Sequence, residues 1–182
     1  MHKIATWALF IAACAMPVVP VLQQTQEAGV APPQQVRVVL QDASGRQVGE
    51  AVLTQKPEGL HVKVEARGLT PGYHGFHIHE KGVCEAPTFE SAGAHFNPSG
   101  ANHGFLNAHG PHAGDFPNLL ADANGTASGE WVTQRVTLKK GEPHSLLRNG
   151  GTALIIHSGS DDYLTDPAGN AGARAACGVI AD

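Results

Sequence analysis

Short hydrophobic runs separated by turn residues recur along most of this chain. In one of them, Val62 and Val64 flank Lys63, which gives the period of two that a half-buried strand shows. Glycine and proline are abundant between the runs, and helix-forming residues are scattered. The runs predict eight strands, near 36–41, 47–54, 60–66, 75–80, 117–122, 126–136, 152–157 and 175–180.

Turn signals support the same division. Asn124-Gly125 between two of the runs is a strong β-hairpin signal, and Ser44-Gly45 marks another turn. Residues 36–182 are enough to bury one core. The pattern therefore predicts a single all-β domain over residues 36–182. We expect an eight-stranded antiparallel Greek-key barrel or sandwich, immunoglobulin-like, with two long functional loops.

The N-terminal segment has a different composition. A short polar start precedes the apolar run Ile4–Ala13, which is too short to span a bilayer and has the length of a signal-peptide core. We expect a signal peptide over residues 1–15 and a flexible tether over residues 16–35, because its Gln/Pro/Ala-rich part has little to bury. The protein would then be exported, to the periplasm or cell envelope.

Two ends of the signal peptide stay open. Small residues around Ala13 allow ordinary cleavage after Ala15. Residues 11–14 also resemble a bacterial lipobox, in which Cys14 would become the lipidated first residue of a lipoprotein. In that case the lipid on Cys14 would be the protein's only membrane contact.

Charge narrows the range of partners. The formal net charge is −4, and no stripe of lysine and arginine appears along the chain. A basic stripe is the usual electrostatic signature of nucleic-acid binding. We therefore expect no nucleic-acid partner.

Histidines concentrate in one stretch of the sequence. Neutral imidazole is the commonest metal ligand in proteins, so the cluster is hard to explain as solvated surface. His77 and His79 are two apart in a strand-like segment, so both side chains point to one face and can converge on one ion. The candidate ligands are His77, His79, His95, His103, His112, Asp115 and, further on, His157.

Four of these candidates, from His95 to Asp115, lie in a Gly/Pro/Asn-rich stretch that indicates a long loop. Loops of this length are usually functional or disordered, and a metal that gathers its ligands would explain an ordered one. Three histidines and one aspartate form a set that tetrahedral zinc accepts. An all-imidazole site suits copper, zinc, iron or nickel. The spacing predicts two metal sites that share one ligand.

Four motifs carry a resemblance to the copper–zinc superoxide dismutase family, bacterial exported type. They are GLTPGYHGFHIHE (68–80), GAHFNP (93–98), HAGDFPNL (112–119) and GNAGARAACGVI (169–180). The resemblance covers nearly all of the chain after about Val36 and implies one copper and one zinc per subunit. Copper would be bound by His77, His79, His95 and His157, and zinc by His95, His103, His112 and Asp115, with His95 bridging the two ions.

The resemblance also implies roles for residues that bind no metal. Asp161 would bridge the copper ligand His77 and the zinc ligand His103, because a ligating histidine usually donates its second N–H to a carboxylate or carbonyl. His74 would pack and hydrogen-bond beside the copper strand without binding metal.

Arg174 and His95 are the residues to which the resemblance assigns catalysis. Arg174 would dock superoxide beside the copper, and His95 would take up a proton that helps form the product. The loop from Ser158 to Ala173 lacks the lysine and glutamates that shape the electrostatic channel of the better-known eukaryotic type. Steering of the anion must then come from elsewhere, with Lys81 as a candidate, or be weaker.

Cys84 and Cys177 could be buried thiols, metal ligands or a disulfide. Their spacing is not C-x-x-C, which argues against a zinc ribbon or a redox motif. An exported chain meets an oxidising compartment in which disulfides persist, and the resemblance pairs these two positions. A bond closing so long a loop would stabilise the fold by roughly 4–5 kcal/mol, less any strain.

The implied function is dismutation of superoxide to oxygen and hydrogen peroxide by a redox-cycling copper with a structural zinc, an antioxidant defence outside the cytoplasm. The alternative is a non-catalytic copper/zinc-binding exported module. Such a module would keep the zinc loop but lose a copper ligand or Arg174, and neither is missing here. Superoxide is the expected partner, and a homodimer is a candidate assembly.

Overall fold

A computed structural model describes residues 34–182, so the predictions for the signal peptide, Cys14 and most of the tether lie outside the described residues. Over the part that is described, no helix is long and apolar enough to cross a membrane. The elements are β1 (Gln35–Asp42), β2 (Gln47–Lys56), β3 (Gly59–Ala66), β4 (Gly72–His79), η1 (Glu90–Ala92), β5 (Asp115–Ala121), β6 (Ala127–Thr133), η2 (Arg148–Gly150), β7 (Thr152–His157) and β8 (Arg174–Ile180), where η marks a short 3-10 helix.

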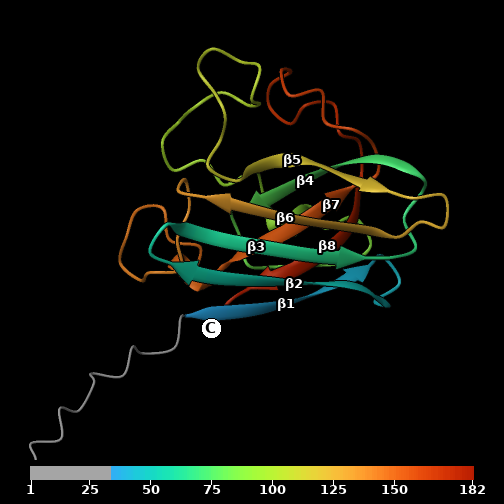
Figure 1. Cartoon of the computed structure of the whole chain (residues 1–182), viewed down its shortest axis with the longest axis horizontal. Helices are drawn as coiled ribbons and strands as arrows, with labels where there is room; N and C mark the ends of the chain where they lie inside the picture. Colours follow the sequence, from blue (N-terminus) through green and yellow to red (C-terminus); the bar gives the residue numbers. More distant parts are fainter. Residues whose placement is uncertain (1–33) are drawn as a thin grey trace, which may run out of the picture. The chain divides into compact units, whose positions relative to one another are not determined.

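The eight strands close into one antiparallel barrel in the order β1-β2-β3-β6-β5-β4-β7-β8 (Figure 1). The neighbours β3 and β6, and likewise β4 and β7, are not consecutive in sequence, which gives the barrel its Greek-key crossovers. Closure gives each strand a neighbour on both sides, although β5 and β6 pair only at Ala121 and Ala127. The prediction of an eight-stranded all-β fold is confirmed, and its closed form is a barrel.

Buried side chains, which alternate with exposed ones along the strands, fill the inside of the barrel. On β4, Phe76 and Ile78 are fully buried in the main core. The ring of Phe76 lies 5.6 Å from that of Phe116 and 5.1 Å from that of Trp131, measured between centroids. Because successive side chains on a strand point to opposite faces, His77 and His79 point away from this core. The packing of Phe76 and Ile78 therefore fixes the direction of both imidazoles.

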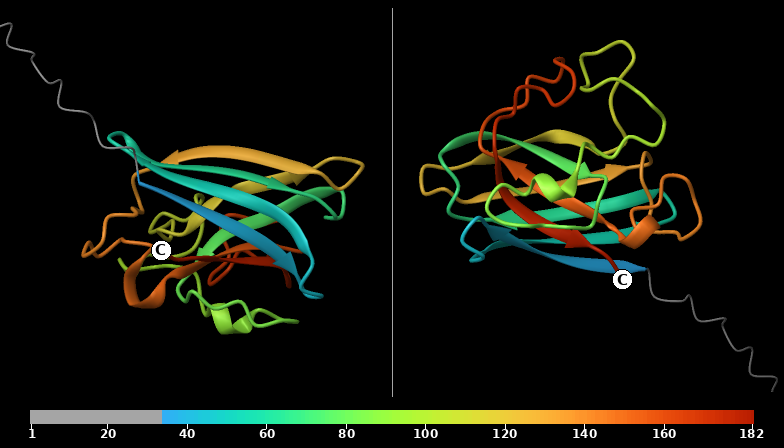
Figure 2. Two further views of the ribbon diagram at one scale, coloured as in Figure 1. Left: turned by 90° about the horizontal axis from the view of Figure 1, so that it is seen from below. Right: turned by 180° about the vertical axis from the view of Figure 1, so that it is seen from behind.

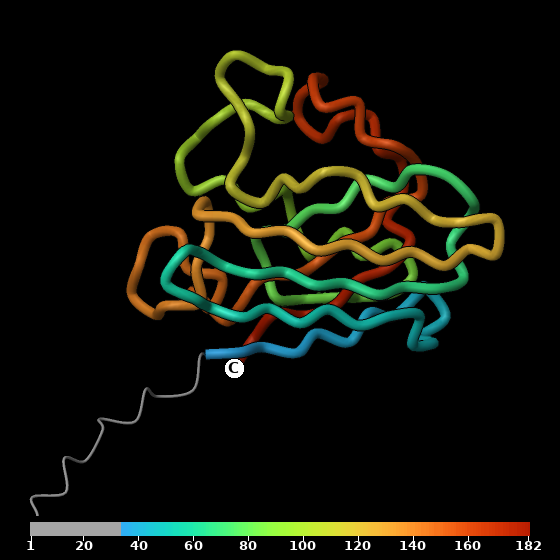
Figure 3. The backbone as a smooth tube through the Cα atoms, in the orientation of Figure 1, coloured from blue at the N-terminus to red at the C-terminus, as the bar shows by residue number. Residues whose placement is uncertain are grey.

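Two long loops follow the strands that carry histidines, as the sequence predicted. Residues 80–114 connect β4 to β5, and residues 158–173 connect β7 to β8. Their outer parts lie next to each other beyond β5, on one side of the barrel (Figure 3), where Leu106 donates its N–H to Tyr163 O at 2.9 Å. The inner part of the first loop, with η1, lies against β7 and β8 (Figure 2, right). The metal ligands thus lie on strands of the barrel and in the first long loop, on the side of the barrel that the two loops cover.

Some predicted boundaries shift by a few residues. Asp115 is the first residue of β5 and not part of the loop, because it pairs with His77 of β4. β4 begins at Gly72, where Tyr73 and His74 already pair with β5. β6 ends at Thr133, since its partner strand β3 provides no pairing beyond Leu60. The first strand includes Gln35, which the sequence assigned to the tether.

Candidate metal centre

The seven candidate ligands come from three strands and one loop. β4 supplies His77 and His79, β7 ends at His157, and β5 begins at Asp115. The loop before β5 supplies the other three. All seven are buried, with at most 6% of any residue exposed. They form two groups of four whose donor atoms lie within 4.8 Å of one another, namely His77, His79, His95 and His157, and His95, His103, His112 and Asp115.

The first group presents four imidazole nitrogens that no protein atom satisfies. They are Nδ1 of His77 and Nε2 of His79, His95 and His157, and each is buried without a hydrogen-bond partner. Buried polar atoms are rarely left unpaired in proteins, so four together call for a ligand. An all-nitrogen set of this kind suits copper.

The second nitrogen of each ring is held in place. His77 Nε2 lies 2.7 Å from Asp161 Oδ2, His79 Nδ1 lies 2.9 Å from Gly93 O, and His157 Nδ1 lies 3.1 Å from Gly172 O. These acceptors fix the tautomer, so that the free nitrogen of each ring is the one that faces the site.

Burial favours the neutral form that a metal requires in three rings of this group, those of His79, His95 and His157. Loss of hydration lowers the pKa of His79 well below its usual value. The same cause lowers the pKa of His95 to about 4 and that of His157 to about 3. Neutral imidazole is the ligating form, and these three rings are therefore in the form that binds metal at neutral pH.

The second group has the spacing of a tetrahedral site. His95 Nδ1 and His112 Nδ1 lie 3.4 Å apart, and they lie 3.0 and 3.4 Å from Asp115 Oδ1. His103 Nδ1 lies 3.2 Å from Asp115 Oδ2. Donors at 2.0–2.1 Å from a tetrahedral zinc would be about 3.3–3.4 Å apart. The donor chemistry and the spacing therefore both fit zinc.

His95 belongs to both groups through opposite sides of one ring. Its Nδ1 faces Asp115 and His112, while its Nε2 is one of the four unsatisfied nitrogens of the copper set. The shared imidazole that the sequence predicted is therefore confirmed. With it, the complete copper and zinc ligand sets are confirmed as well.

Asp161 connects the two groups a second time. Its Oδ2 accepts from His77 Nε2 at 2.7 Å, and its Oδ1 accepts from His103 Nε2 at 3.0 Å. Burial alone would raise the pKa of Asp161, but the hydrogen bonds from His103 and His77 hold it below its usual range. The facing atoms of His77, His103 and Asp161 are already hydrogen-bonded to one another. We therefore do not regard these three residues as a third metal site.

Asn118 on β5 holds Asp161, a role that no pattern in the sequence indicates. Its Oδ1 accepts from the backbone N–H of Asp161 at 2.9 Å, and its Nδ2 donates to Asp161 O at 2.8 Å. Because the amide both donates and accepts, it holds the backbone of the second loop against strand β5. A lone Asn in a strand has no sequence pattern that would predict such a contact.

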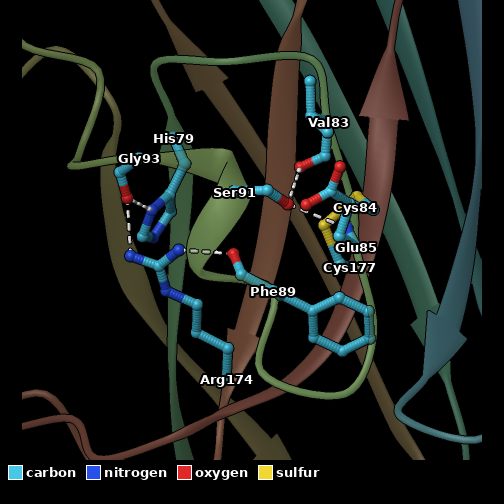
Figure 4. The surroundings of a disulfide bond; sticks show 9 residues. All are labelled: His79, Val83, Cys84, Glu85, Phe89, Ser91, Gly93, Arg174 and Cys177. Carbon is cyan, nitrogen blue, oxygen red and sulfur yellow. Dashed lines mark hydrogen bonds between the residues drawn. A yellow bond between two sulfur atoms is a disulfide. The ribbon is translucent and has the colours of Figure 1, made fainter.

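Arg174 lies at the start of β8, close to the copper set (Figure 4). Its guanidinium donates from Nη1 to Phe89 O and from Nη2 to Gly93 O, both at 2.5 Å. Gly93 O is the same carbonyl that accepts from His79 Nδ1. The predicted disulfide is also confirmed, with the Cα atoms of Cys84 and Cys177 5.8 Å apart. It ties the first loop to the strand that carries Arg174.

The remaining histidines of the described part stay outside both groups. His74 is buried, with Nδ1 2.6 Å from His157 O and Nε2 2.7 Å from Thr70 O, so it packs beside the copper strand as expected. His61 contacts the carboxylate of Glu58 at the surface. Lys81, the candidate for steering, is exposed and lines a cavity of about 840 Å³ together with His95 and Arg148.

The closed β-barrel and the two ligand sets that share a histidine define a dinuclear metalloprotein. The family described as copper/zinc superoxide dismutase (SODC) matches residues 47–180 of this chain. Superoxide dismutase [Cu-Zn] 2 of Aquifex aeolicus (strain VF5) is 54% identical over 140 residues, covering 76% of this chain and 82% of that protein. The chain belongs to the copper/zinc superoxide dismutase family.

Solved structures agree with this assignment. The crystal structure of a SOD-like protein from Bacillus subtilis has 45% sequence identity and a TM-score of 0.76, covering 79% of this chain and 97% of that one. The Cu/Zn superoxide dismutase from Brucella abortus has 34% identity and a TM-score of 0.65, covering 81% of this chain and 99% of that one. Fold, ligand sets and relatives thus lead to the same family.

Proposed function

We propose that this protein converts superoxide to oxygen and hydrogen peroxide outside the cytoplasm. The observation that carries the proposal is the pair of complete donor sets joined by His95, with four buried nitrogens that have no hydrogen-bond partner in the protein. Bound copper supplies the one-electron redox chemistry, whereas zinc with its filled d shell supports the geometry. Superoxide is the substrate that family membership implies.

The chain's own residues bind and orient the anion and carry a proton. Arg174 stays charged at every relevant pH and is anchored beside His79, so it attracts the anion and orients it toward the copper set. His95 Nε2 has no protein partner, which supports its role as the atom that takes up and delivers a proton to the product. The burial of the remaining ligands keeps bulk water from competing at the site.

One experiment distinguishes the proposed dismutase from the alternative, a non-catalytic copper/zinc-binding module. Metal content and dismutase activity are measured together on the purified protein loaded with both metals. The proposal requires one copper and one zinc per chain together with dismutation. Full loading with both metals and no dismutation would establish the binding module instead.

Export is the second part of the proposal. The Cys84–Cys177 disulfide supports it, because such bonds persist in oxidising compartments, and so does the signal-peptide pattern of residues 1–15. A Cys14→Ser variant, followed by cell fractionation, separates the two signal-peptide endings. A lipoprotein would lose membrane association or stall as precursor, whereas identical processing and full solubility of both forms would exclude the lipid anchor.

The proposed assembly is a homodimer. Tyr73 on β4 and Leu120 on β5 are paired in register on the outer face of the barrel, and both are more than half exposed. Adjacent exposed apolar side chains support a protein contact there. Sedimentation of the metal-loaded protein over a range of concentrations tests this, and a monomer at all concentrations would exclude the dimer.

A further inference from the structure

Arg174 is held by the first loop through backbone atoms, and the disulfide itself makes no contact with its guanidinium. Figure 4 shows the guanidinium between the carbonyls of Phe89 and Gly93, with the Cys84–Cys177 bond on the far side of Phe89. Cys84 precedes Phe89 by five residues, and the residues 85–88 between them are all exposed. The disulfide therefore holds the beginning of this segment, and the peptide that meets Arg174 is linked back to it through the N–H of Phe89, which donates to Glu85 O at 2.9 Å.

Phe89 is the residue that attaches this peptide to the barrel. Its side chain is 2% exposed, while its neighbours Thr88 and Glu90 are exposed. The ring packs in a small cluster separate from the main core. That cluster contains Phe89, Ala92, Ala153, Ile155 and Cys177, with Cys84 partly buried against it.

The backbone of Phe89 supports the same conclusion. Its φ of 55° and ψ of 19° place it in the left-handed region, which is sparsely populated for a bulky residue. Such a conformation persists where the surrounding structure enforces it. Here it turns the carbonyl of Phe89 toward both Arg174 Nη1 and the N–H of Ala92, at 2.5 and 3.1 Å. Burial of the ring on one side and orientation of the carbonyl on the other are thus linked.

We propose that Phe89 is a positioning residue for the reaction. Its buried ring fixes the peptide whose carbonyl holds Arg174 Nη1, so that the guanidinium stays beside His79 and faces the incoming anion. Without the ring, the segment from Glu85 to Glu90 loses its one buried side chain, and Arg174 keeps Gly93 O as its remaining carbonyl partner. This inference rests on the proposed role of Arg174 in binding the substrate anion.

The test uses the metal-loaded protein and its Phe89→Ala and Phe89→Leu variants. Thr88→Ala is the matched control, because Thr88 is the exposed neighbour in the same loop. The two readouts are the rate constant for dismutation and the dissociation constant of azide, a small anion whose binding to copper is followed by absorption. Misplacement of a positioning group by about 1 Å can cost up to ~100-fold. We expect Phe89→Ala to lose about tenfold or more in both, with copper and zinc content unchanged.

The conservative and combined variants show whether Phe89 acts through Arg174. Phe89→Leu keeps a buried apolar side chain and should recover most of the rate and of the azide affinity. In an Arg174→Ala background, Phe89→Ala should add no further loss, because the two changes remove the same interaction. Equal losses in both backgrounds would overturn the proposal, as would unchanged azide affinity in Phe89→Ala.

A measurement on the metal-free protein provides an independent readout. Amide hydrogen exchange across residues 85–93 should accelerate in Phe89→Ala and stay unchanged in Thr88→Ala, with the disulfide intact in both. If Phe89→Ala does not fold, Phe89→Val takes its place in every comparison, with a smaller loss expected because Val keeps part of the buried apolar surface. Azide binding also keeps this inference separate from the proposed function. If the protein bound both metals but did not dismutate superoxide, Phe89→Ala would still bind azide more weakly than the wild type.

Discussion

Asp161 and His103 lie on different loops, 58 positions apart in sequence, yet Asp161 Oδ1 is 3.0 Å from His103 Nε2. The other carboxylate oxygen reaches His77 on β4. One buried side chain therefore orients a ligand from each metal set, and neither ring can rotate without losing its partner. Through these two hydrogen bonds, the second loop contacts a ligand of each metal site.

Replacing Asp161 by Ala should weaken both sites together. Alanine has neither carboxylate oxygen, so the rings of His77 and His103 each lose their acceptor. Loss of such an outer partner typically costs 10–100-fold in metal affinity, and we expect about that loss for zinc and copper. Competition with a chelator measures it. Asp162→Asn is the control, because the exposed Asp162 caps its turn with oxygens that an amide can supply in part. Weakening confined to one metal would contradict the shared role.

His157→Ala should separate the two metals. His157 belongs to the copper set alone, and its replacement removes one of four nitrogens without touching the donors that face zinc. We expect dismutation to be lost while one zinc per chain stays bound. Elemental analysis and an activity assay on the same sample measure this. Turnover at the wild-type level would show that His157 is not a copper ligand.

Much of the fold and most of the donor atoms follow from patterns that the sequence displays directly. Alternation around Val62 and Val64 predicts a strand because burial on one face selects apolar residues at every second position. The spacing of His77 and His79 predicts convergence for the same reason. Motifs of this kind need only local geometry, so they can be interpreted without knowing how distant segments meet.

Contacts made by backbone atoms could not be predicted in this way. The carbonyls of Phe89 and Gly93 hold Arg174, but every residue has a carbonyl, and its direction depends on loop torsions such as the left-handed φ of Phe89. The same holds for Asn118, whose amide clamps the backbone of Asp161. Asp115 also looked like a loop residue, because its place in β5 depends on pairing with β4.

Zinc binding should depend on pH through His103. Burial alone would lower the pKa of His103, but hydrogen bonds to Asp115 and Asp161 raise it to about 9 in the metal-free protein. Below that pH the ring carries a proton that zinc must displace, because only the neutral ring ligates. The apparent zinc affinity should therefore rise about tenfold per pH unit toward pH 9 and then level off. Chelator competition at pH 7, 8 and 9 measures this, and an affinity that stays flat across this range would contradict the raised pKa.

Removing the disulfide should lower stability more than it lowers activity at room temperature. The bond between Cys84 and Cys177 closes a loop of 93 residues, so its loss should cost roughly 4–5 kcal/mol in unfolding free energy, less any strain. Phe89 still attaches the loop near Arg174, so the remaining folded protein should keep much of its rate. Chemical unfolding and dismutation by the Cys84→Ser/Cys177→Ser variant measure the two effects. Complete loss of rate in fully folded, metal-loaded protein would show that the disulfide alone positions the loop.

Charge at Arg174 is expected to dominate the attraction of the substrate. Arg174→Glu reverses that charge and should lose most of the rate. Arg174→Lys keeps the charge but cannot reach both carbonyls with a planar fork, so it should fall to an intermediate rate. Copper and zinc contents provide the control, since Arg174 belongs to neither ligand set. Wild-type kinetics in Arg174→Glu would exclude any role for this residue in binding the substrate.

The salt dependence of the rate separates steering from docking at the same residue. Added salt shortens the reach of the field to about 8 Å at physiological ionic strength, so a rate that depends on steering must fall with salt. The loop from Ser158 to Ala173 lacks lysine and glutamate, and Lys81 lines the cavity beside His95. We therefore expect the wild-type rate to decrease only slightly with added salt. Arg174→Glu should remove or reverse this decrease, and Lys81→Glu should reduce it only in part. If Arg174→Lys instead falls as far as Arg174→Glu while the wild-type rate is independent of salt, Arg174 acts by holding the anion in place and not by attracting it from a distance.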